Sequence, residues 1–170
     1  MISSGAGFDA AVCYAADNSR LKKALNKIHL GKLIYLLKAL KMIFTMKMPS
    51  AQIRIDGQTE MHFDKVIFAA AMNTKYEGGG FMFAPDADPG DGYIDLLIAE
   101  GMPRLRILFI LPTSFKGKHL KYKELHLIRC KKAEAHFSEE VCIHVDGEHF
   151  GFSKDVQFSL HLECINTISS

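Results

Sequence analysis

Hydrophobic and polar residues alternate in several short stretches of the chain, which is the pattern that half-buried β-strands produce. Residues 52–55 alternate, Asp56 and Gly57 follow as a strong hairpin-turn signal, and a second alternating stretch surrounds residues 61–63. Residues 66–72 form a continuous apolar run of strand length, which predicts a buried strand. Further strands are predicted at residues 93–98, 125–129, 133–137, 141–145 and 156–162.

Two parts of the chain have helical spacing instead. Residues 19–46 predict two helical pieces that are broken near residues 29–31, with Ser19 as the N-cap of the first piece. Residues 105–111, which lie between two prolines, predict another short helix. The apolar face of the second helical piece comprises Leu33, Leu36, Leu37, Leu40, Ile43 and Phe44, with Lys38 and Lys41 toward the other face. The pattern therefore predicts a mainly β fold, a sandwich or barrel-like sheet with a helical region near the N-terminus.

Composition places this fold among globular domains. The chain has 170 residues, 48% of them hydrophobic, and a net charge of +2, which excludes an intrinsically disordered protein. We find no sign of a domain boundary, so residues 1–170 are expected to form one domain. The longest apolar runs, 107–111 and 66–72, are far shorter than the ~20 residues of a membrane-spanning helix. No secretory signal is visible and the four cysteines lack metal-type spacing, so we expect a cytoplasmic domain with reduced core thiols.

Charge is distributed unevenly along the chain. Residues 20–48 contain eight basic residues and no acidic ones, whereas the remainder has 13 basic and 19 acidic residues. This basic segment is either an amphipathic helix packed on the sheet or a surface that lies against an anionic membrane. Nucleic acid is not expected as a partner, because the overall charge is weak and no base-stacking motif is present.

Three short motifs are candidates for chemistry, and each also has a purely structural interpretation. Gly78, Gly79 and Gly80 form either a turn or a phosphate-binding loop, although the spacing of a P-loop is absent. The acidic loop 86–95 is either a solvated turn or a site for a hard cation such as Mg²⁺. The triplet 146–148, Asp-Gly-Glu, is a hairpin turn whose glutamate would serve as a general base beside a hydroxyl group. The eight histidines are scattered and predict strand-face residues rather than metal ligands.

Taken in order along the chain, a set of short motifs resembles a known family. The motifs are Gly7-Phe8-Asp9-Ala10, the helical stretch 31–37, Asn73 followed by Gly78-Gly79-Gly80, Pro85 with Asp91-Gly92 and Asp95, Gly117-Lys118-His119, and Asp146-Gly147-Glu148. This series resembles the C-terminal domain of the bacterial diacylglycerol kinase and YegS-like lipid kinases, which are related to sphingosine kinases. The resemblance extends from Gly7 to about Leu162.

The resemblance implies a two-domain enzyme that uses ATP as co-substrate and Mg²⁺ as cofactor. An N-terminal domain would bind ATP through a GGDGT motif, and the C-terminal domain would be a β-sandwich like that of NAD kinases. By resemblance, Glu148 is the proton acceptor, and Asn73, Gly78, Gly79 and Gly80 contribute to cofactor binding. Asp88, Asp91 and Tyr93 would bind Mg²⁺ through side-chain or backbone oxygens.

The chain departs from this family in lacking a GGDGT motif. We therefore expect an isolated C-terminal domain, inactive alone, whose parent phosphorylates diacylglycerol or a similar lipid hydroxyl at the membrane surface. Pairing with a second copy stays open. The alternatives are a non-catalytic module that binds lipid through its basic helix, including Lys38 and Lys41, and a kinase domain for a soluble substrate.

Overall fold

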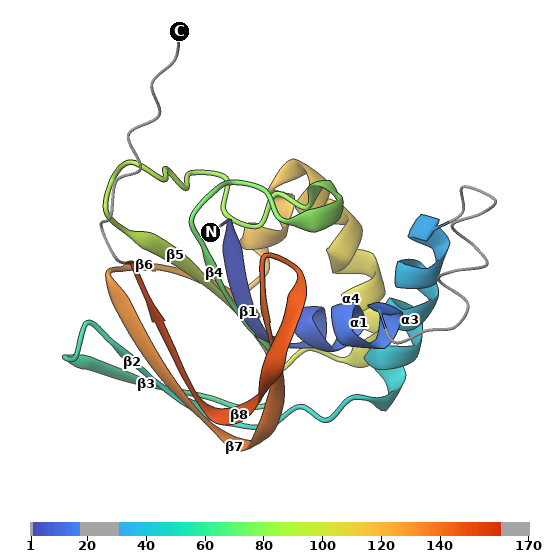
Figure 1. Ribbon diagram of the computed structural model, residues 1–170, viewed down its shortest axis with the longest axis horizontal. Coiled ribbons are helices and arrows are strands. Elements are labelled where there is room, and N and C mark those ends of the chain that lie inside the picture. Colours follow the sequence, from blue (N-terminus) through green and yellow to red (C-terminus); the bar gives the residue numbers. More distant parts are fainter. Residues whose placement is uncertain (1, 18–30, 161–170) are drawn as a thin grey trace, which may run out of the picture.

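The computed structural model describes residues 2–17 and 31–160, and their eight strands form one curled antiparallel sheet (Figure 1). The strands are β1 (Ser3–Gly7), β2 (Ala51–Ile55), β3 (Thr59–Phe63), β4 (Val66–Met72), β5 (Ile94–Glu100), β6 (Leu125–Cys130), β7 (Lys132–Val145) and β8 (Glu148–Ser159). Their order is β3-β2-β7-β1-β4-β5-β6, and β8 pairs with β7. The predicted mainly β, sandwich-like fold is confirmed.

The long strand β7 joins the two halves of the curled sheet. Its first part pairs with β2, from Ala133 to Phe137, and its last part pairs with β1, from Ile143 to Val145. Strand β8 pairs with both parts, and the register shifts between His136 and Val141. A bulge of this kind increases the local bend of a strand, so one strand can serve both halves. The prediction of two separate strands here was wrong, because the irregular stretch interrupts the alternation without ending the pairing.

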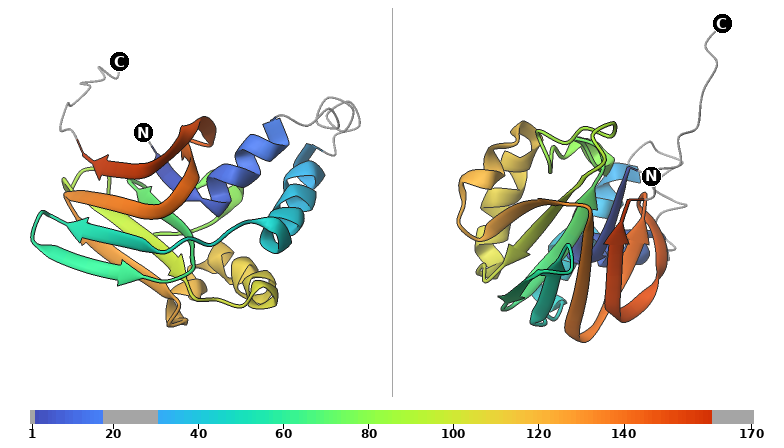
Figure 2. Two further views of the ribbon diagram at one scale, coloured as in Figure 1. Left: turned by 90° about the horizontal axis from the view of Figure 1, so that it is seen from below. Right: turned by 90° about the vertical axis from the view of Figure 1, so that its left-hand side faces the viewer.

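Each face of the sheet buries its own hydrophobic core. One core lies within the curl and includes Ile53, Leu96 and Phe137. The other lies beneath the helices α1 (Phe8–Asp17), α3 (Gly31–Thr45) and α4 (Arg104–Ile110), as Figure 2 shows. Strand β4 contributes alternate residues to both cores, which explains its continuous apolar sequence. Three 3₁₀ helices, η1 (Gly78–Gly80), η2 (Leu111–Lys116) and η3 (Lys118–Lys121), complete the described elements.

The helical predictions have mixed outcomes. The helices at residues 31–45 and 104–110 are confirmed, whereas Ser19, the first helical piece and the break up to residue 30 lie outside the described residues. Ile43 is buried as expected, but Leu37 and Phe44 are about half exposed, at 49% and 52%. At these three positions, the apolar face of the helix is therefore only partly covered. Strand β1 and helix α1 were not predicted.

Two of the described cysteines are buried thiols, and the described helices are not of the membrane-spanning kind. Cys130 and Cys142 are buried, and burial raises the pKa of each thiol to about 11. Cys164 lies outside the described residues. Within the described ranges, no helix has the length and apolar content needed to cross a membrane.

Candidate active site

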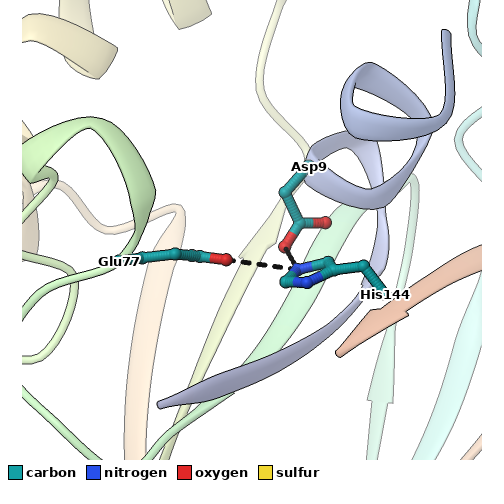
Figure 3. Close-up of side chains that lie close together, drawn as sticks. All are labelled: Asp9, Glu77 and His144. Atoms are coloured by element: carbon teal, nitrogen blue, oxygen red, sulfur yellow. Dashed lines mark hydrogen bonds and ion pairs between the residues drawn. The ribbon is translucent and has the colours of Figure 1, made fainter. Parts of the chain in front are cut away.

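Three ionisable side chains from distant parts of the chain meet on the helix-covered face of the sheet (Figure 3). His144 is on β7, Asp9 is in the first turn of α1, and Glu77 follows β4 directly before the glycine triplet. The Nε2 atom of His144 lies 2.9 Å from Asp9 Oδ2 and 3.2 Å from Glu77 Oε1. The imidazole is fully buried, and the carboxylate side chains are only 13% and 12% exposed. We call these three residues the buried cluster.

Gly5 makes this arrangement possible. It is on β1, paired with His144 of β7 and Ala70 of β4. A Cβ atom built on Gly5 would overlap both the Asp9 carboxylate and the His144 ring. The two side chains therefore meet in the space that a larger residue at position 5 would fill.

The surroundings of the buried cluster favour binding of protons. Burial alone would lower the pKa of His144, but the hydrogen bonds and charges of Asp9 and Glu77 outweigh burial and raise it to about 10. Burial raises the pKa of Glu77 despite the opposing hydrogen bond from His144. Ser3 Oγ also donates a hydrogen bond to Glu77 Oε1, while Glu77 Oε2 is buried with no partner among the described residues. Because the groups interact closely, these shifts belong to the cluster as a unit.

The hydrogen bond at the second ring nitrogen of His144, Nδ1, indicates whether Nε2 carries a proton or binds a metal ion. The backbone N–H of Gly147 donates to Nδ1 over 3.1 Å, so this arrangement holds the neutral ring with its proton on Nε2, between the two carboxylates. The additional proton that the raised pKa implies is therefore held by the cluster as a unit. Asp9, Glu77 and His144 form a three-ligand group whose atoms lie within 4.8 Å of one another. A metal ion at Nε2 would require the proton to move to Nδ1, where the Gly147 N–H already points. The geometry therefore favours a shared proton over a metal ion.

The same histidine is connected to the turn that carries Glu148. Asp146 and Gly147 both have positive φ, 51° and 82°, as in the tight turns of two-residue hairpins. Asp146 Oδ1 accepts the backbone N–H groups of Ile2 and Ser3, at 2.6 and 3.0 Å. Burial opposes ionisation of Asp146, but these hydrogen bonds outweigh it and lower the pKa of the carboxyl. The turn is thus held to β1 and to His144, and it presents Glu148, the first residue of β8, exposed to solvent.

Aromatic side chains lie beside this turn. His149 is 4.4 Å from the Tyr14 ring and 5.1 Å from the Phe152 ring, measured between ring centroids. Its Nδ1 atom lies 3.3 Å from Cys142 Sγ. Phe150, the next residue along β8, is 76% exposed. Glu148 therefore stands at the edge of an apolar surface formed by α1 and β8.

The glycine triplet is next to the buried cluster but does not form a helical phosphate site. Gly78, Gly79 and Gly80 are exposed and form the single 3₁₀ turn η1, which Glu77 and Phe81 close by pairing. Asn73 lies at the end of β4, where its N–H donates to the carbonyl of Ile2. The structure thus brings Asn73, the triplet and the Glu148 turn to the strand end where β1 begins.

The acidic loop forms a separate region. Asp88 Oδ1 accepts the N–H of Gly90, and Asp91 Oδ1 accepts the N–H of Tyr93. The other oxygen of Asp91 pairs with Arg129, whose guanidinium lies 4.9 Å from the centre of the Tyr93 ring. The oxygen donors of Asp88, Asp91 and the loop backbone suit a hard cation, which would compete with Arg129 for Asp91.

Most of this chain matches a known domain family. Residues 2–163 match the family model of the YegS C-terminal NAD kinase β-sandwich-like domain. The chain belongs to this family. The chain is 30% identical over 147 residues to YtlR of Bacillus subtilis strain 168, provisionally named a lipid kinase, covering 86% of this chain and 47% of YtlR. Diacylglycerol kinase of Mycobacterium tuberculosis is 30% identical over 125 residues, covering 74% of this chain and 38% of the relative.

Solved structures agree on the fold. A crystal structure from Bacillus anthracis str. Sterne, provisionally named a diacylglycerol kinase, superposes with a TM-score of 0.59 at 19% identity. The alignment covers 93% of this chain and 50% of that protein. The chain spans about half the length of this structure and of YtlR, and the inferred resemblance to the lipid kinase family is confirmed.

Within this family domain, the sequence motifs indicated only part of the site. Glu148 was a candidate because of its motif and stays a prediction, whereas Glu77 and His144 were not singled out. His144 occupies an alternating strand position and was expected to be an ordinary strand-face residue. Asp9 belongs to the Gly-Phe-Asp-Ala motif, but nothing in that motif indicates a partner 135 residues away. The adjacency of Glu77 to the glycine triplet, and of His144 to the Asp-Gly-Glu triplet, was the available signal.

Proposed function

We propose that this chain is the C-terminal half of an ATP-dependent lipid kinase that phosphorylates a hydroxyl group of diacylglycerol or a similar lipid. The proposal rests on membership of the YegS C-terminal family, whose relatives include proteins named diacylglycerol kinase. These relatives are nearly twice as long as this chain, so the nucleotide is expected to bind mainly to the other half. The protein would act at the membrane surface, where its substrate resides.

Glu148 is the proposed proton acceptor. Its backbone position is held by the contacts of the turn with β1 and His144, while its side chain is exposed to an incoming hydroxyl group. A carboxylate placed beside the lipid hydroxyl would accept its proton as the oxygen attacks the γ-phosphorus of ATP. The aromatic surface beside the turn would contact the apolar part of the lipid.

The buried cluster would position this base. His144 contacts Asp9, Glu77 and the Gly147 N–H at once, so it couples the start of α1, the segment before the glycine triplet and the Glu148 turn. Asn73 and Gly78, Gly79 and Gly80, which are exposed or partly exposed at the same strand end, would contribute to nucleotide binding. In this proposal the cluster holds a proton and fixes the turn without touching substrate.

Asp88, Asp91 and Tyr93 would hold Mg²⁺, which would supply positive charge that stabilises the loop and offsets phosphate charge. Isothermal titration and thermal melting test this assignment on the chain itself. Mg²⁺ at ten times its Kd is expected to raise the free energy of unfolding by about 1.4 kcal/mol in the unmodified chain but not in Asp91→Asn. Asp64→Asn, a change of an exposed aspartate on another loop, is the matched control. Equal responses of all three proteins would show that Asp91 does not contribute to a Mg²⁺ site.

The activity test joins this chain to a nucleotide-binding half and measures transfer of labelled phosphate from ATP to dispersed diacylglycerol. Glu148→Gln is expected to lower kcat at least ~100-fold, the usual minimum contribution of a general base. Glu140→Gln, which changes an exposed glutamate on β7, is expected to keep the activity. If Glu148→Gln keeps the activity as well, Glu148 is not the proton acceptor.

The same assay separates the substrate classes. Phosphorylation of NAD or another soluble alcohol, with no transfer to any dispersed lipid, would show that the protein is a kinase for a soluble substrate and not a lipid kinase. Absence of transfer to both classes, with ATP bound, would support a non-catalytic lipid-binding module.

A further inference from the structure

A second apolar surface is formed by α3 and α4. Leu105 and Phe109, one helical turn apart on α4, are 62% and 77% exposed. Leu37 and Phe44, two turns apart on α3, are 49% and 52% exposed. Arg104 at the start of α4 donates to the carbonyl of Met46, just after α3, over 2.8 Å and also to that of Ile43. This places the end of α3 beside the beginning of α4, as Figure 2 also shows. We call this surface the α3–α4 surface.

The helices that form this surface lie in two stretches of purely basic charge. Residues 101–123 contain six basic residues and no acidic residue, and residues 31–48 contain four basic residues and no acidic residue. Lys41 on α3 is exposed, and so are Lys116 and Lys118, which belong to η2 and η3 and follow α4 in the chain. Two of the other basic residues have acidic partners: Arg106 pairs with Glu124, and Lys47 with Glu139. The exposed aliphatic and aromatic side chains thus belong to stretches of sequence with an excess of positive charge.

We propose that the α3–α4 surface docks this protein on an anionic lipid bilayer, with Leu105 and Phe109 inserted between the headgroups and the lysines against lipid phosphates. Large apolar side chains on one helical face, flanked by Lys and Arg, are what an interfacial helix uses to bind such a membrane. A nucleic acid would match the charge but leave Leu105 and Phe109 in water, so the apolar residues favour the bilayer. The proposal requires neither ATP nor the activity of Glu148.

Co-sedimentation with vesicles of phosphatidylcholine, with and without phosphatidylserine, tests the docking surface on the chain itself. Binding is expected only when phosphatidylserine is present, and it should weaken as salt is added. Phe109→Ser is expected to weaken binding by at least tenfold, because the bilayer would no longer bury a Phe side chain at this position. Lys116→Gln and Lys118→Gln should each weaken it by about fivefold.

Lys154→Gln is the matched control, because Lys154 is exposed like Lys116 and Lys118 but is on β8. It is expected to leave vesicle binding unchanged, and a loss equal to that of Lys116→Gln would overturn the assignment to the α3–α4 surface. Binding to single-stranded RNA with none to vesicles would overturn it in favour of nucleic acid. A dimer in solution that Phe109→Ser dissociates, again without vesicle binding, would make a second copy the partner. If the protein phosphorylates diacylglycerol but does not bind the vesicles, the docking proposal is wrong and the proposed function still holds.

Discussion

The two acidic regions of this chain differ in how their charges are assembled. Asp88 and Asp91 are three residues apart in one loop, where nearby backbone N–H groups and Arg129 are their partners. Asp9 and Glu77 come from distant segments and meet a fully buried histidine. The loop retains contact with solvent, so its ionic interactions are screened, whereas each partner of the buried cluster depends on the others. Closeness in sequence therefore made the loop conspicuous, while tertiary packing formed the more strongly interacting site.

The largest effect should come from Gly5→Ala. The new Cβ would overlap Asp9 and His144, so the cluster would have to separate, and we expect a loss of about 3 kcal/mol in unfolding free energy. Urea unfolding followed by circular dichroism measures this loss. The control is Gly90→Ala in the acidic loop, where the new Cβ meets ordinary contact distances and the change should stay below about 0.5 kcal/mol. Equal losses in the two variants would contradict the comparison.

The next effect concerns the two cationic partners. His144→Gln removes the group that both buried carboxylates contact and should cost about 2 kcal/mol. Arg129→Gln removes the cationic partner of Asp91 but leaves the loop in water, so it should cost less than about 1 kcal/mol. Urea unfolding at constant pH compares the two, and a larger loss at Arg129 would reverse the ranking of the regions.

The pH dependence of stability provides a third test. Folding raises the pKa of His144 from 6.5 to about 10, so the folded chain binds more protons than the unfolded chain in this range. The stabilisation is complete below pH 6.5 and is lost as pH rises toward 10, by at most about 1.4 kcal/mol per pH unit for one proton. Unfolding curves from pH 6.5 to 9 should show this slope in the unmodified chain but not in His144→Gln. His126→Gln, which leaves the cluster intact, should keep the slope.

The smallest effect is expected for Glu77→Gln. Burial opposes the charge of this carboxyl and raises its pKa, so a neutral side chain of the same shape should change stability by no more than about 0.5 kcal/mol. Glu77→Leu, which also removes the acceptor for His144 and Ser3, should cost more. A loss above about 2 kcal/mol in Glu77→Gln would show that the charge itself stabilises the cluster.

Much of the fold followed from local pattern. The hairpin at Asp56-Gly57, the buried strand at residues 66–72 and the short helix near residue 105 all have clear periodicity and turn residues, and all were predicted close to their observed bounds. Strand β1 was missed because its Ser, Gly and Ala residues have little strand propensity, and it is a strand because β4 and β7 pair with both of its edges. The partial exposure of Leu37 and Phe44 was left open by the sequence, since helical spacing alone does not say how much of an apolar face is covered.

The sequence by itself determined the fold class and family of this protein. Alternation, turns and a series of short motifs are local properties, so they can be recognised without knowledge of the packing. It also identified Glu148, the glycine triplet and the acidic loop as candidates. Only the tertiary structure decided that Asp9, Glu77 and His144 meet beside Gly5, and that Leu105 and Phe109 stay in solvent. The physical reason is that burial and electrostatic coupling depend on which segments the sheet brings together, and strand pairing here joins residues more than a hundred positions apart.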